Sequence, residues 1–160
     1  MLKNKFVLLT SLCASLMFLS SGPANAQNFG VEEQQGQAAK YVNGGIGDGQ
    51  TVYMKSIAGN WPMRIMFSQL KANEFVAGVN LQITDKSSAT MLQLDSAGPL
   101  TYVQLPPGAY RVTAIHDGQT QTRNVTLGRN SKSDVHFHWK GSVKSDPFDS
   151  KPLGGTQVPG

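Results

Sequence analysis

Residues 105–118 read Leu105-Pro106-Pro107-Gly108-Ala109-Tyr110-Arg111-Val112-Thr113-Ala114-Ile115-His116-Asp117-Gly118. Two consecutive prolines and a glycine predict a turn, because proline fixes its own φ and lacks a backbone donor. From Ala109 onward the side chains alternate between apolar and polar, which is the period of a half-buried β-strand. Asp117-Gly118 is typical of a two-residue hairpin turn. The stretch therefore predicts a turn, a strand and a hairpin.

Other segments with a period of two lie on both sides of this stretch. We expect strands at about residues 63–68, 75–84, 92–96, 100–105, 109–117, 119–127 and 135–139. In the second strand, Phe75, Ala77, Val79, Leu81 and Ile83 are expected to share one face. Seven short strands punctuated by Gly, Pro, Asn and Asp predict an all-β fold, a seven-stranded antiparallel β-sandwich over residues 61–140.

The segments outside the predicted sandwich are short. Residues 27–47 are rich in Gln and Gly and are expected to form a mobile or weakly helical leader. A short N-terminal helix is expected within residues 48–60, before the first strand, with Asp48 as its N-cap. The glycines of Gly44-Gly45-Ile46-Gly47 lack the spacing and context of a phosphate-binding loop and predict a flexible hinge. Residues 141–160 are interrupted by Pro and Gly and predict a disordered tail.

Residues 1–26 have the pattern of a secretory signal peptide. Lys3 and Lys5 precede an apolar segment, and Ala24-Asn25-Ala26 has the small-x-small form of a cleavage site. Cleavage after Ala26 would leave a mature chain without cysteine, because Cys13 lies inside the signal and lacks the flanking residues of a lipidated cysteine. We therefore expect a periplasmic or secreted protein that has no membrane segment after cleavage.

The charge balance argues against a nucleic-acid partner. The chain has 14 Lys and Arg against 10 Asp and Glu. Without Lys3 and Lys5 the count is 12 against 10, and no basic run is present. Phosphate backbones are bound by clustered Lys and Arg, which the sequence lacks.

Three of the segments above also carry a family resemblance. Residues 75–85, Phe75-Val76-Ala77-Gly78-Val79-Asn80-Leu81-Gln82-Ile83-Thr84-Asp85, precede the turn and strand at 105–112 and the strand from Gly118 to Leu127. Together they resemble the carboxypeptidase regulatory-like domain, a prealbumin-like β-sandwich, over residues 63–139. The resemblance implies an accessory module without catalysis. We expect a non-catalytic binding or interaction module whose partner is an unknown protein or envelope component, with no cofactor.

Catalytic motifs give little support to an enzyme. A zinc carboxypeptidase requires a His-x-x-Glu motif, but none of the three histidines has a Glu nearby in the sequence. The prealbumin-related hydrolase of purine breakdown ends in Tyr-Arg-Gly-Ser, whereas this chain ends in Gln157-Val158-Pro159-Gly160. No Gly-x-Ser-x-Gly turn is present either. We expect no enzyme activity, and a minor hydrolase is kept as the second alternative.

The first alternative is a histidine metal-binding protein. His136 and His138 are two residues apart on a predicted strand, so both side chains point the same way, and His116 from another strand is a candidate third ligand. Strand alternation alone also explains the pair, as two exposed residues opposite an apolar face. Trp61 and Tyr102 are interpreted as core or rim residues rather than as a sugar-stacking surface.

Overall fold

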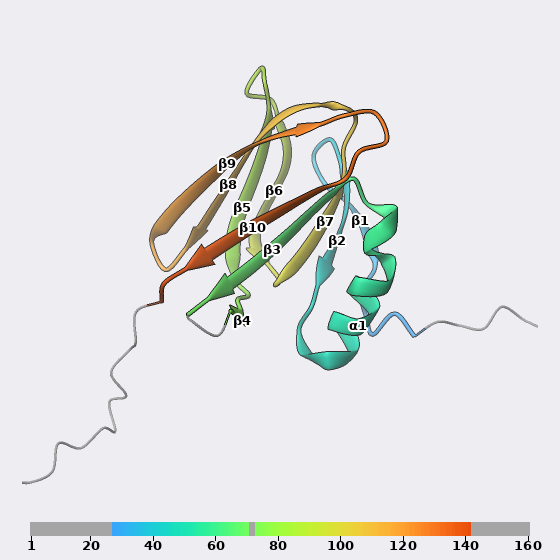
Figure 1. Ribbon diagram of the computed structural model, residues 1–160, viewed down its shortest axis with the longest axis vertical. Helices are drawn as coiled ribbons and strands as arrows, with labels where there is room; N and C mark the ends of the chain where they lie inside the picture. Colours follow the sequence, from blue (N-terminus) through green and yellow to red (C-terminus); the bar gives the residue numbers. More distant parts are fainter. Residues whose placement is uncertain (1–26, 71–72, 142–160) are drawn as a thin grey trace, which may run out of the picture.

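The computed structural model describes residues 27–70 and 73–141 (Figure 1). Most of these residues lie in two β-sheets, and one helix packs beside them. The predicted all-β sandwich is confirmed in this coarse sense. The predicted number of strands is wrong, because the described residues form ten strands rather than seven.

The first sheet has the strand order β1-β2-β7-β3-β10, with β4 paired to β3. Its strands are β1 (Glu33–Gln35), β2 (Lys40–Gly44), β3 (Met63–Gln69), β4 (Glu74–Phe75), β7 (Leu100–Gln104) and β10 (Ser133–Trp139). All pairs are antiparallel except β3 and β10, which run parallel with Ser133 opposite Met63. The expectation of a wholly antiparallel sandwich is therefore wrong at this pair.

The second sheet has the order β6-β5-β8-β9 and is antiparallel throughout. Its strands are β5 (Val79–Asp85), β6 (Thr90–Ala97), β8 (Gly108–His116) and β9 (Gln119–Leu127). Asp117 and Gly118 connect β8 to β9 with φ values of 46° and 71°. Positive φ at both central residues matches the mirror-image turn that favours a twisted hairpin, so the predicted Asp-Gly hairpin is confirmed.

The main core lies between the two sheets. It is filled by the inward residues of each strand, among them Ile65, Phe67, Leu81, Val112 and Phe137. Between β7 and β8 the Tyr110 hydroxyl donates a hydrogen bond to the Pro106 carbonyl at 2.8 Å. The proline turn is therefore tied to the strand that follows it, and the buried tyrosine hydroxyl has a partner.

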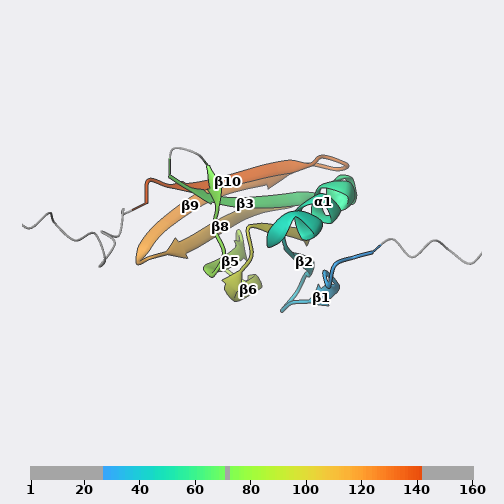
Figure 2. The same ribbon diagram turned by 90° about the horizontal axis from the view of Figure 1, so that it is seen from below.

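The helix α1 (Gly47–Ile57) packs on the outer face of the first sheet and continues into a 3-10 turn (Ala58–Asn60). Figures 1 and 2 show it beside β2 and β7 and apart from the second sheet. A second apolar cluster fills this contact and contains Val31, Val42, Met54, Trp61, Leu100 and Tyr102. The helix therefore covers one side of the outer face. Burial of Trp61 and Tyr102 here confirms that they are core residues.

Residues 27–47 depart from the prediction of a mobile or weakly helical leader. They contain β1 and β2, and β2 pairs with β7 along its whole length. Tyr41 is buried in the core between the sheets, and Val42 is buried under the helix. Two adjacent apolar residues are too few to show a period, so their burial on opposite faces could not be read from the sequence.

The predicted strand at 75–84 is divided into β4 and β5. Gly78, with a φ of 72°, lies between them and interrupts the alternation. As a result Val76 is buried, whereas Phe75 is 41% exposed and Ala77 is exposed. The expected inward position of Phe75 and Ala77 is wrong, while that of Val79, Leu81 and Ile83 is confirmed.

The predicted N-cap of the helix is also wrong. Asp48 lies within the first turn, and Ile46 occupies the N-cap position without a side-chain hydrogen bond of its own. The Gln50 side chain instead reaches back and accepts a hydrogen bond from the Ile46 backbone N–H at 3.1 Å. A glycine at position 47 with a φ of 75° allows the chain to turn into the helix one residue before Asp48.

The predicted signal peptide at 1–26 lies outside the described residues, as does the predicted tail at 141–160 except for Gly141. In the parts of the chain that the structure describes, no helix is both long and apolar enough to cross a membrane.

Replacing Phe137 by Ala tests the phase of β10. Phe137 is fully buried between the sheets, so we expect a loss of about 3–5 kcal/mol in the free energy of unfolding. His138→Ala is the matched control on the opposite face, and we expect a loss of about 1 kcal/mol or less because one hydrogen bond disappears. Urea denaturation of both variants is the measurement. Equal losses would contradict this phase, and a larger loss for His138→Ala would mean that the two faces of β10 are exchanged.

Candidate binding groove

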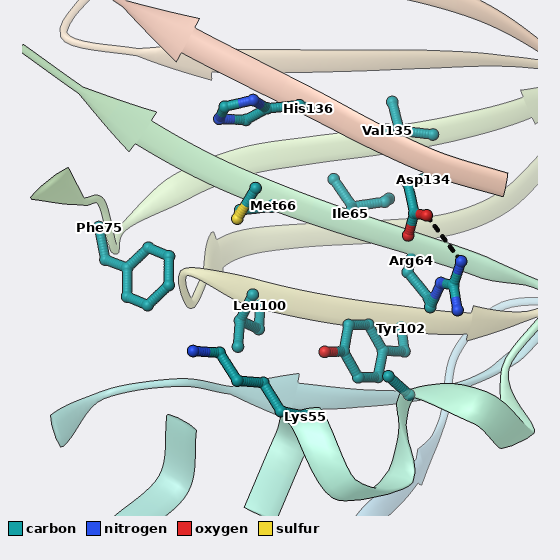
Figure 3. A pocket seen from close by; sticks show the side chains of 11 residues that line it. Lys55, Arg64, Ile65, Met66, Phe75, Leu100, Tyr102, Asp134, Val135 and His136 are labelled. Carbon is teal, nitrogen blue, oxygen red and sulfur yellow. Dashed lines mark hydrogen bonds and ion pairs between the residues drawn. The ribbon is translucent and has the colours of Figure 1, made fainter. Parts of the chain in front are cut away.

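A groove of about 290 Å³ opens on the outer face of the first sheet (Figure 3). The helix α1 and its 3-10 turn form one wall, β10 forms the other, and β7 and β3 form the floor. The lining residues are Lys55, Ala58, Arg64, Ile65, Met66, Phe75, Leu100, Tyr102, Asp134, Val135 and His136. The groove exists because the helix covers β2 and β7 but leaves β3 and β10 uncovered.

Strand register places the outward side chains of this face in three rows that cross the strands. Alternation along β3 and β10 points one set of residues into the core and the other set outward. The first row is Tyr102, Arg64 and Asp134; the second is Leu100, Met66 and His136; the third is Phe75, Ser68 and His138. The first and second rows and Phe75 line the groove, while Ser68 and His138 lie beyond it.

The first row carries most of the groove's polar groups. Arg64 Nη2 is 2.7 Å from Asp134 Oδ2, and the side chain of Arg64 is 21% exposed against 77% for Asp134. Arg64 Nε is buried without a hydrogen-bond partner, and no other buried side-chain polar atom in the described residues lacks one. Burial raises the pKa of the Tyr102 hydroxyl, which the charge of Arg64 partly opposes. The tyrosine therefore stays protonated at neutral pH.

The second row is apolar apart from His136. Met66 and Leu100 form the middle of the floor, and Phe75 lies across from them at the end away from Arg64 (Figure 3). Met66 and Leu100 also contact the apolar cluster under the helix, which fixes their position. The groove therefore has an apolar middle and one polar end.

The predicted histidine pair spans the second and third rows. Ser68 Oγ is 2.6 Å from His136 Nε2 and 3.0 Å from His138 Nδ1, and the serine is only 1% exposed. A hydroxyl can donate one hydrogen bond and accept another, so Ser68 gives each imidazole one hydrogen-bond partner. The structure thus brings His136 and His138 together on the outer face, as the alternation predicts.

His116 lies elsewhere. It ends β8, its ring centroid is 5.4 Å from that of the core residue Trp139, and its Nε2 is 3.6 Å from Asp117 Oδ2. Trp139 faces the core whereas His136 and His138 face outward, so the structure does not bring the three histidines together. No group of three or more His, Cys, Asp or Glu side chains close enough to hold a metal occurs in residues 27–70 and 73–141.

The serine and histidine contacts are also poorly arranged for nucleophilic catalysis. Ser68 Oγ is buried and engaged by two imidazoles, and no carboxylate contact to either imidazole is found in the described part of the chain. A serine nucleophile needs access to substrate and a histidine that is oriented by a third group. The geometry supports a structural role for this cluster.

The groove residues Arg64, Asp134, Met66 and Lys55 were not singled out from the sequence. The alternation of β3 and β10 places the first three on outward faces, and this signal was readable. Their meeting depends on the parallel pairing of two strands that are far apart in the chain. Nothing in the local pattern of either strand indicates that neighbour.

Acidification should destabilise the fold through His136. Burial, followed by the charges of His138 and Arg123, holds the pKa of His136 below its ordinary value of 6.5. The unfolded chain therefore binds a proton first, so this contribution to stability is complete above about pH 6.5 and is lost as the pH falls through the lower folded pKa. We expect His136→Gln to show a shallower decline in the free energy of unfolding between about pH 7 and pH 5. Urea denaturation across that range measures it, and equal slopes would contradict it.

The histidine pair should bind metal only weakly. Two imidazoles and a hydroxyl fall short of the three or four fixed ligands that a tight zinc site uses. We expect zinc and copper to bind with a dissociation constant above about 1 μM in calorimetric titrations. His116→Ala is the control and should change nothing. Tighter binding that disappears in His136→Ala would establish a metal site.

Comparison with known proteins identifies no family for the chain. No protein-family model matches it, and no curated protein matches it. The likeness to the carboxypeptidase regulatory-like domain therefore stays a resemblance carried by the three segments at 75–85, 105–112 and 118–127.

Proposed function

We propose that this protein is a non-catalytic binding module that holds its ligand in the groove between α1 and β10. It would act in the periplasm or after secretion, as the signal-like sequence at 1–26 suggests, and its partner would be a protein or another envelope component. The observation that carries the proposal is an open groove with an apolar floor and one polar end on an otherwise covered sheet face.

The exposed apolar side chains support this proposal. Phe75 is 41% exposed beside the groove, where a regular strand without the interruption at Gly78 would bury it. Met66 is half-buried at the centre of the floor. When a ligand covers large apolar side chains grouped in a concave site, the free energy falls because apolar surface is removed from water.

A metal-binding function is the second candidate. It is favoured by one observation, the convergence of His136 Nε2 and His138 Nδ1 on a single oxygen, Ser68 Oγ. An ion placed between the two nitrogens would still need further ligands from outside the described cluster. The zinc and copper titrations described above decide this candidate.

Filling the groove tests the proposed function. N-phenylnaphthylamine, a neutral apolar dye, should bind the purified protein in a saturable manner with one site per chain. Met66→Trp places a larger side chain on the floor, and we expect the affinity for the dye to fall at least about tenfold. Fluorescence titration of the dye measures this effect.

The matched control is Val52→Trp. Val52 is 66% exposed on α1 and does not line the groove, so the same side chain there should leave dye binding unchanged. If the dye does not bind the wild-type protein, or if both variants bind it as the wild type does, the groove is not a ligand site.

A further inference from the structure

We propose that the groove binds a small amphipathic carboxylate, meaning a single acyl or aryl chain with one terminal carboxylate. The carboxylate would contact Arg64 and Tyr102 at the polar end, and the chain would lie over Met66 and Leu100 towards Phe75. This inference rests on the proposed function and names the ligand class for the same site.

Arg64 Nε is a buried donor without a hydrogen-bond partner. A guanidinium presents several N–H donors in a planar fork that suits a carboxylate. One donor nitrogen, Nη2, bonds Asp134, whereas Nε is buried in the fold without any partner. Buried polar groups are nearly always satisfied, so an orphaned donor beside a groove indicates a missing acceptor. Asp134 itself shows that a carboxylate fits against this arginine.

Asp134, which forms the ion pair with Arg64, is largely exposed to solvent. Its side chain is 77% exposed, while that of Arg64 is 21% exposed. An exposed carboxylate held by one bond gains little free energy from the pair, because water competes for it. A ligand carboxylate can therefore share or replace this contact at small cost.

The lining of the groove contains more cationic than acidic side chains. Lys55 on the helix wall and Arg64 on the floor are cationic, and Asp134 is the only acidic lining residue. Lys55 forms no ion pair within the described residues. The lining therefore carries a net positive charge even with His136 neutral, and this favours an anion over a neutral or cationic ligand. The protonated Tyr102 hydroxyl adds a neutral donor in the same row as Arg64.

The shape of the groove also matches the proposed ligand. Figure 3 shows Arg64 and Phe75 on opposite sides of Met66 and Leu100. The volume of about 290 Å³ is close to the lower limit of ordinary small-molecule sites, about 300 Å³. A single short acyl chain or a small aromatic molecule fits this space. The polar end and the apolar middle thus match the two parts of one amphipathic molecule.

Three ligands with the same tail test the inference on the wild-type protein. Decanoate, decanol and decyltrimethylammonium carry a negative, a neutral and a positive head, and each is titrated by calorimetry below its aggregation concentration. We expect decanoate to bind at least about tenfold more tightly than decanol, which corresponds to about 1.4 kcal/mol. The cationic ligand should bind most weakly of the three.

Charge-removing variants locate the head group. Arg64→Gln should bring the affinity for decanoate to about that for decanol and leave decanol binding unchanged. Arg64→Lys keeps the charge but loses the fork, so its affinity for decanoate should be intermediate. Arg129→Gln, on the loop before β10 and outside the groove lining, is the matched control. Lys55→Gln, on the exposed helix surface, gives an independent reduction of about twofold to threefold if Arg64→Gln fails to fold.

The possible outcomes separate this inference from the proposed function. Equal binding of decanoate and decanol, lost in both cases in Met66→Trp, would leave the groove as a ligand site and overturn the carboxylate. Preference for decanoate that survives Arg64→Gln and Lys55→Gln would also overturn it. Failure of all three ligands and of the neutral dye to bind would overturn the proposed function as well.

Discussion

The parallel pairing of β3 with β10 is the constraint on which the rest of this structure depends. It joins two strands that are separated along the chain by the entire second sheet, and it runs without a register shift from Ser133 opposite Met63 to Trp139 opposite Gln69. Because the side-chain period of a strand is two, this register determines both faces at once. The inward faces contribute Phe67, Phe137 and Trp139 to one aromatic group in the core, and the outward faces contribute the three rows that carry the groove and the histidine pair.

The outer face is divided by what covers it. On the β2 and β7 side the helix and its apolar cluster exclude water, whereas on the β3 and β10 side the rows stay open. β10 is an edge strand of the first sheet, and β9 of the second sheet lies against it: the Gln121 side chain donates to the His138 carbonyl at 2.7 Å, and Arg123 lies over the Phe137 ring at 5.3 Å from its centroid. These contacts close the side of the sandwich and hold β10 in place. β10, which forms one wall of the groove, is therefore held in place by β9, and a fixed wall suits a preformed ligand site.

Much of the fold could be predicted from local patterns, and the groove could not. The turn before Tyr110, the Asp117-Gly118 hairpin and the phase of Val135, Phe137 and Trp139 follow from proline and glycine chemistry and from alternation, and all are confirmed. The helix was expected in its correct place, although its N-cap was assigned two residues too late, to Asp48 instead of Ile46, whose N–H is bonded by the Gln50 side chain. β1, β2 and the parallel pair were missed because their stability comes from pairing with distant strands, and short polar strands carry no period of their own. Arg64 lies on a correctly predicted outward face, whereas Asp134 lies just before the strand expected at 135–139, and only the neighbour relation between β3 and β10 makes them a pair.

The three rows also differ in how completely their polar groups are satisfied, and this difference indicates where a ligand is needed. Ser68 in the third row bonds one nitrogen of each imidazole, so the buried hydroxyl and the two histidines are hydrogen-bonded within the fold. The middle of the second row is apolar and requires only cover. In the first row Arg64 has one bond to an exposed aspartate and one buried donor with no acceptor. The two histidines stand out in the sequence because of their residue types, yet in the fold they already share one hydrogen-bond partner, Ser68 Oγ. The interaction that the fold leaves open belongs to an arginine that the sequence pattern marks only as outward-facing.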